Sequence, residues 1–186
     1  DIRSSGLFAI VREGAVGEGG AIRVTVNDRL SILDGGTISA STFSEGDTGT
    51  LTINANQIEV SGRRSDGDRS AIAAQVNPGA TGDAQTVTIN AQQLLLQDGG
   101  RLSSETTGQG KAGDLFINVS DIQLAGSDTQ IVAQTTTDFQ AGTIDIQPTA
   151  GQTDVAIAFQ DGATISAETS GNKIGGDISL TAPESI

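Results

Sequence analysis

Residues 97–119 read QDGGRLSSETTGQGKAGDLFINV, and this stretch has two close counterparts in the chain. Residues 33–55 read LDGGTISASTFSEGDTGTLTINA, and residues 160–182 read QDGATISAETSGNKIGGDISLTA. Each stretch has an Asp-Gly corner, an alternating apolar pair, a polar glycine-rich segment and a second alternating pair. The chain is therefore a tandem array of one unit, and the array has to be recognised before any single segment is interpreted.

Each unit contains three short segments in which an apolar residue recurs at every second position. The first segment supplies Leu30/Ile32, Ile58/Val60, Leu94/Leu96, Ile122/Leu124 and Ile157/Phe159. The second supplies Leu7/Ala9, Ile38/Ala40, Ile72/Ala74, Leu102/Ser104, Ile131/Ala133 and Ile165/Ala167. The third supplies Ile22/Val24, Leu51/Ile53, Val87/Ile89, Leu115/Ile117, Ile144/Ile146 and Ile178/Leu180. A period of two predicts β-strands, and strands this short bury a continuous core only when successive units stack.

The predicted fold is an all-β solenoid of about six coils with three short strands in each coil. In the first coil we prefer the pair Leu7/Ala9 over Phe8/Ile10, because it aligns the glycines of this unit with those of a later one: Gly14 and Gly17 with Gly79 and Gly82. The predicted coils span residues 1–27, 28–55, 56–91, 92–119, 120–147 and 148–182. We expect these coils to form a single segment of a longer chain.

Two corners carry the extra residues of the longer units. One is SGRRSDGDRS at residues 61–70, and the other is QPTAGQTD at residues 147–154. Insertions at the corners of a solenoid leave the stacking undisturbed, and such loops often carry the binding residues. The charged residues of the first insertion are the candidate binding loop: Arg63, Arg64, Asp66, Asp68 and Arg69.

Composition excludes several functional classes. Aromatic residues make up only 3% of the chain, which suits a narrow aliphatic interior. There is no cysteine and no histidine, so disulfides, thiolate or histidine metal sites and histidine-based catalysis are excluded. The net charge of −13 argues against binding to nucleic acids and to anionic membranes, because both need a basic surface. No apolar run is long enough for a membrane helix.

One pair of carboxylates deserves comparison with glycoside hydrolases. Glu105 and Glu168 occupy equivalent outward positions two coils apart, with Gln134 between them. Two strand spacings give roughly 9.6 Å, near the upper end of the separation of about 6.5–9.5 Å in inverting enzymes. The alternative, which we favour, is two solvated acids on an acidic surface.

Calcium sites are the other chemistry that the carboxylates allow. Asp34, Asp98 and Asp161 fall at equivalent corners, but Gly62 and Gly126 replace them in alternate coils. Carboxylates two coils apart are too distant to share an ion. The pair Asp66 and Asp68 fits no calcium-loop pattern, and the neighbouring arginines can neutralise it, so we predict a solvated loop and no cofactor.

Two columns of equivalent residues predict repeated interior and edge contacts. A small residue ends each second segment, which predicts a crowded interior position: Ala9, Ala40, Ala74, Ser104, Ala133 and Ala167. An amide follows four of the third segments: Asn54, Asn90, Asn118 and Gln147. Stacked amides can hydrogen-bond along the solenoid, although asparagine is also simply a favourable turn residue.

The repeats resemble those of a known family of exported proteins. SGLFAIVREGAVGEGGAIRVTVN at residues 5–27, together with the stretches at 33–55 and 97–119, is similar to the repeats of cyanobacterial filamentous-haemagglutinin-like exoproteins of the two-partner secretion class. The resemblance covers nearly the whole chain. It implies a right-handed parallel β-helix, export through an outer-membrane secretion partner, and a secreted or cell-surface location.

The function expected from these observations is structural or adhesive and not enzymatic. The segment would act as a filament or spacer that binds surface glycans or cells, and the alternative is a polysaccharide-active β-helix enzyme. An ice-binding surface is disfavoured because the outward positions of the third segment are too varied: Thr52, Thr88, Phe116, Asp145 and Ser179. Exposed strand edges and core at the two ends predict end-to-end self-association.

Overall fold

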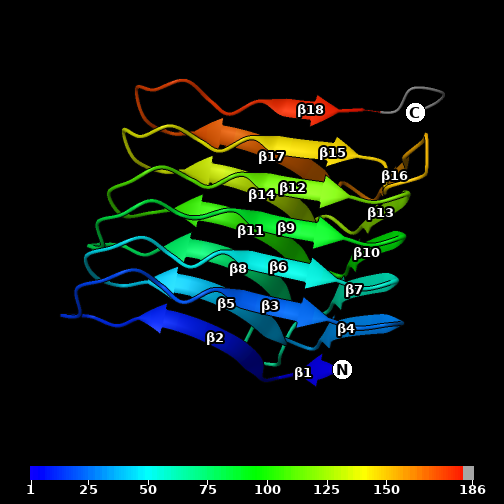
Figure 1. Ribbon diagram of the computed structural model, residues 1–186, viewed down its shortest axis with the longest axis horizontal. Helices are drawn as coiled ribbons and strands as arrows, with labels where there is room; N and C mark the ends of the chain where they lie inside the picture. The colour runs from blue at the N-terminus through cyan, green and yellow to red at the C-terminus, as the bar shows by residue number, and fades with distance from the viewer. Residues whose placement is uncertain (182–186) are drawn as a thin grey trace.

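The computed structural model describes residues 1–181, and this part of the chain is all β-structure without a helix. Three strands form each coil, and Figure 1 shows six coils stacked in chain order as a right-handed parallel β-helix. The predicted fold class is therefore confirmed. Ala182, the last residue of the sixth predicted coil, lies outside the described residues.

Equivalent strands of successive coils form three parallel sheets of six strands each. The first sheet contains β1 (Ile2–Arg3), β4 (Arg29–Leu33), β7 (Gln57–Ser61), β10 (Gln93–Gln97), β13 (Asp121–Ala125) and β16 (Ala156–Gln160). The second contains β2 (Gly6–Val11), β5 (Thr37–Thr42), β8 (Ala71–Val76), β11 (Arg101–Thr106), β14 (Gln130–Thr135) and β17 (Thr164–Thr169). The third contains β3 (Ile22–Thr25), β6 (Leu51–Asn54), β9 (Val87–Asn90), β12 (Leu115–Asn118), β15 (Ile144–Gln147) and β18 (Ile178–Leu180).

The strand register agrees with the alignment of the repeats. Ile89 pairs with Ile53 on one side and with Ile117 on the other. In the first coil Leu7 pairs with Ile38, so the preferred register there is also confirmed. The sequence analysis missed β1, which pairs with β4 in the first sheet. That strand has only two residues, too few to show a period.

The core is a column of aliphatic side chains along the axis of the helix. Its largest fully buried side chains are all isoleucine or leucine, and Ile89 is 0% exposed. The small residues predicted for a crowded interior position are completely buried in the middle coils, at Ala40, Ala74, Ser104 and Ala133. The one hydroxyl of this set is satisfied, because Ser104 Oγ accepts a hydrogen bond of 2.9 Å from the Gly113 N–H. A polar group is tolerated in the core when it is hydrogen-bonded in this way.

The amide ladder is present at the end of the third sheet. Asn118 Nδ2 donates to Asn90 Oδ1 over 2.7 Å, and Asn90 Nδ2 donates to Asn54 Oδ1 over 2.8 Å. Asn54 Nδ2 ends the row with a longer bond of 3.4 Å to Thr25 Oγ1. Gln147 pairs with Asn118 through the backbone register. Its side chain makes no hydrogen bond within residues 1–181.

The Asp-Gly corners are tight turns between the first and second sheets. Asp34 and Gly35 have φ angles of 53° and 79°, and the Gly36 N–H donates to the Leu33 carbonyl over 2.9 Å. Two successive positive φ angles define a type I′ turn, for which Asp-Gly is a preferred sequence. Asp98 and Asp161 adopt the same conformation, with φ of 52° each. The column of aspartates that raised the question of calcium therefore has a structural role.

Candidate functional site

The insertion at residues 61–70, here called the arginine loop, is a closed excursion from the corner between β7 and β8. The Arg64 N–H donates to the Asp68 carbonyl over 2.7 Å, which folds the loop back on itself. Ser70 closes its base: Ser70 Oγ donates to the Ser61 carbonyl over 2.6 Å and accepts from the Gly35 N–H over 3.0 Å. The strands on either side keep their register, so the loop is added to an intact stack.

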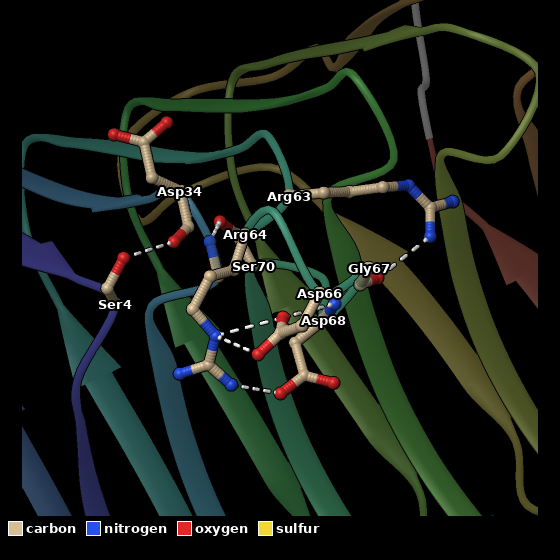
Figure 2. Close-up of polar contacts among 9 residues, drawn as sticks. Ser4, Asp34, Arg63, Arg64, Asp66, Gly67, Asp68 and Ser70 are labelled. Carbon is tan, nitrogen blue, oxygen red and sulfur yellow. Dashed lines mark hydrogen bonds and ion pairs between the residues drawn. The ribbon is translucent and has the colours of Figure 1, made fainter.

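Arg64 forms ion pairs with both carboxylates of the arginine loop (Figure 2). Its Nε lies 3.0 Å from Asp66 Oδ1, and its Nη2 contacts Asp68 Oδ2. The hydrogen bond from Arg64 and that from the Asp68 N–H lower the pKa of Asp66, while Asp66 raises the pKa of Arg64. Within residues 1–181 no cluster of three or more carboxylates could hold a metal ion. The loop is better built for an internal ion pair than for calcium.

Arg63 and Arg69 contact a residue that the sequence analysis did not single out. Arg63 Nη2 lies 2.7 Å from Asp128 Oδ2, and Arg69 Nη1 donates to the Asp128 carbonyl over 3.2 Å. Figure 2 shows Arg63 extending away from the Arg64 group. The five predicted binding residues therefore divide into an internal ion pair and two arginines that reach toward a later coil.

Arginines outnumber carboxylates where the arginine loop meets the second sheet. Burial lowers the pKa of Arg69, and the charges of Arg63 and Arg101 lower it further, whereas Asp128 and Glu105 oppose this effect. Arg69 is half-buried and forms no ion pair within the described part of the chain. Three guanidinium groups thus share two carboxylates. A surplus cation at a half-buried position can pair with an anionic group of a ligand.

Glu105 belongs to this cluster and is not a solvated surface acid, which corrects the interpretation that we favoured from the sequence. It is only 4% exposed, its Oε1 lies 2.8 Å from Arg101 Nη2, and it accepts a bond of 2.6 Å from Gln134 Nε2. The predicted column is confirmed, since β14 pairs Gln134 with Glu105 and with Glu168. Glu168 is exposed and accepts a bond from Ser166. One acid is thus engaged by an arginine, while its counterpart is open to solvent.

No protein-family model, curated protein or solved structure matches this chain. Across residues 1–181 there is also no helix with the length and apolar character needed to span a bilayer. Function is therefore argued from the geometry of the coils and their loops.

Proposed function

We propose that the chain is a structural and adhesive segment of a secreted or surface-attached bacterial exoprotein. It acts as a filament or spacer, and its corner loops contact glycans or cell-surface molecules. One observation carries this proposal: the three sheets keep their register across both insertions. A scaffold of this kind tolerates variable loops, which is the property that a display filament needs.

The arginine loop is the contact element in this proposal. Arg63, Arg69 and Arg101 outnumber the two carboxylates that they face, Asp128 and Glu105. Together with the Arg64 group the site is neutral, on a chain of net charge −13. Long-range repulsion of anions is therefore interrupted at one place, where guanidinium groups can pair with acidic groups of a partner. Export through an outer-membrane secretion partner completes the proposal, and the resemblance of the repeats supports it.

Binding of the labelled protein to a glycan array and to intact cells tests the adhesive function. We expect binding that falls in the double variant Arg63→Ala/Arg69→Ala. Arg23→Ala is the matched control, because Arg23 is an exposed arginine on the third sheet, away from the loop. Equal loss in the control would mean that overall charge, and not this loop, determines adhesion.

The rival function is polysaccharide cleavage, and it predicts a different result. An enzyme would release new reducing ends or unsaturated products from polysaccharides, and Glu105→Gln would abolish that activity. Such activity together with absent cell and glycan binding would refute the adhesive proposal. The burial of Glu105 against Arg101 favours the non-enzymatic alternative.

A further inference from the structure

A second polar site lies at another corner of the coil, between the third sheet and the first. A groove of about 320 Å³ is formed there, within the size range of small-ligand sites. Its polar lining consists of Asn56, Asn90, Gln92, Asn118 and Thr149, and the rest of the lining is alanine. We call it the amide groove. The strands of the first sheet separate it from the arginine loop, which lies between the first and second sheets.

The insertion at residues 147–154 supplies one wall of the amide groove. At this corner the preceding coils pass from the third to the first sheet through two or three residues, whereas eight residues separate β15 from β16. Figure 1 shows this insertion as the loop between β15 and β16 that rises beside the stack. Thr149 Oγ1 lies 2.8 Å from Ser120 Oγ, and the Gln152 N–H donates to the Thr149 carbonyl over 2.9 Å. The wall is therefore held by defined hydrogen bonds.

Hydrogen-bonding groups in the groove remain free to bind a ligand. Every amide of the ladder donates toward the N-terminal end, so Asn118 Oδ1 is left as the terminal acceptor. Gln92 Oε1 accepts from Ser120 Oγ over 3.2 Å, which leaves Gln92 Nε2 as a donor. Asn56 is exposed, and its side-chain amide has no partner within residues 1–181. The groove thus presents both donors and acceptors.

The polar side chains of this corner form a row along the axis, in which Asn56 and Gln92 are exposed and Ser120 is half-buried. The Gln92 N–H donates to the Asn56 carbonyl over 2.9 Å, and the Ser120 N–H donates to the Gln92 carbonyl over 3.1 Å. Asn56, Gln92 and Ser120 therefore follow one another at the strand spacing of about 4.8 Å. An extended ligand with repeated hydroxyl groups can contact several of them at once.

We propose that the amide groove binds a neutral glycan whose chain lies along the axis of the helix. Sugar hydroxyls both donate and accept hydrogen bonds, as do side-chain amides, and the alanines can contact the carbon face of a sugar ring. Among residues 1–181 no charged side chain lines the groove, although the chain carries a net charge of −13. The lining therefore selects hydroxyl groups and offers nothing to neutralise an acidic sugar. Without an aromatic platform each contact is weak, and affinity grows with the number of sugars bound.

Titration of the isotopically labelled protein with neutral oligosaccharides tests the groove directly. The panel contains cello-, malto-, manno- and galacto-oligosaccharides, with oligogalacturonate as the acidic comparison. We expect at least one neutral series to shift the side-chain amide signals of Asn56, Gln92 and Asn118. The double variant Asn56→Ala/Gln92→Ala should weaken that binding about tenfold or more, as the loss of two hydrogen bonds predicts.

The matched control is Gln109→Ala, which removes an exposed amide at the opposite corner and should bind like the parent. Circular dichroism of each variant verifies the fold. The proposal is overturned if no neutral series shifts these amides, if oligogalacturonate shifts them as strongly, or if the double variant binds like the parent.

This inference extends the proposed adhesive function and rests on it for its biological meaning, but the two fail separately. If oligosaccharides shift the amide signals of the groove but the protein binds no cells, the glycan site would stand and the adhesive function would be refuted. If cell binding depends on Arg63 and Arg69 and no amide signal shifts, the adhesive function would stand and the glycan site would be refuted.

Discussion

Arg63 binds Asp128 across an intervening coil: the two residues are 65 positions apart in the chain, and Nη2 lies 2.7 Å from Oδ2. The arginine side chain passes over Gly99, where an added Cβ would lie 2.8 Å from Arg63 Nε. Residue 99 therefore has to be a glycine, without a Cβ, for the arginine side chain to pass over this corner. The arginine loop therefore links three successive coils along one edge of the helix.

Deletion of residues 63–68 should leave the β-helix intact. Three residues would then join β7 to β8, as Asp98, Gly99 and Gly100 join β10 to β11. The deletion removes the Arg63–Asp128 pair, which is partly exposed and contributes up to about 1 kcal/mol. Circular dichroism should be unchanged, while the binding assigned to the loop disappears. Loss of the β signal would show that the loop is needed for folding.

Ile89→Asp should destabilise the protein by several kcal/mol, because it buries an unpaired charge between Ile53 and Ile117. Thr88→Asp in the same strand is the matched control. Its side chain faces outward, so the expected cost is about 1 kcal/mol or less. Denaturant unfolding measures both. Equal midpoints for the two variants would contradict the assignment of the inward face.

Asn90→Ala should cost about 1–3 kcal/mol, because it removes one hydrogen bond and leaves the Asn118 amide without its acceptor. Asn54→Ala should cost less, since Asn54 ends the ladder with a bond of 3.4 Å to Thr25. The comparison uses the free energy of unfolding of the two variants. A smaller effect at Asn90 than at Asn54 would mean that the ladder contributes little to stability.

The order of the arginine loop should depend on pH in the acidic range. The pKa of Asp66 is lowered in the folded state, chiefly by the hydrogen bond from Arg64. A lowered folded pKa gives stabilisation that is present above the unfolded pKa and is lost as pH falls through the folded one. The contact with Arg64 should therefore persist at neutral pH and weaken as the pH falls below the usual aspartate pKa of about 3.9.

An NMR titration of the Asp66 carboxyl measures this effect. Arg64→Ala should return the pKa of Asp66 toward its usual value. A titration of Asp66 at or above the usual value in the parent protein would contradict the ion pair.

Self-association of this polypeptide should rise with salt. Apolar side chains are exposed on the first and last coils, with Leu7, Phe159 and Ile178 each 45% exposed or more. Repulsion between chains of net charge −13 opposes their contact, and salt screens that repulsion. Light scattering across a salt series provides the measurement. A particle that stays monomeric at high salt and high concentration would contradict the prediction.

The sequence alone was sufficient for the coil order, the inward faces and the strand register. Each depends on local alternation repeated at equivalent positions, as at Ile53, Ile89 and Ile117. The amide ladder was one of two alternatives that the sequence allowed, because a parallel register brings equivalent residues of successive coils together. Of the strands within residues 1–181, only β1 was missed, since two residues cannot display a period.

The contacts between different positions of the repeat were decided by the tertiary structure. The repeat alignment gave no reason to connect Arg63 with Asp128, because that pair depends on the reach of one side chain over a glycine corner. Likewise, the alignment placed Gln134 beside Glu105 but did not show that Glu105 is buried and paired with Arg101. The amide groove requires an insertion to fold back over an earlier corner, as Thr149 does at Ser120. Periodicity determines which residues stack. The contacts of loops and long side chains depend instead on which groups the stacked coils bring close to them in space.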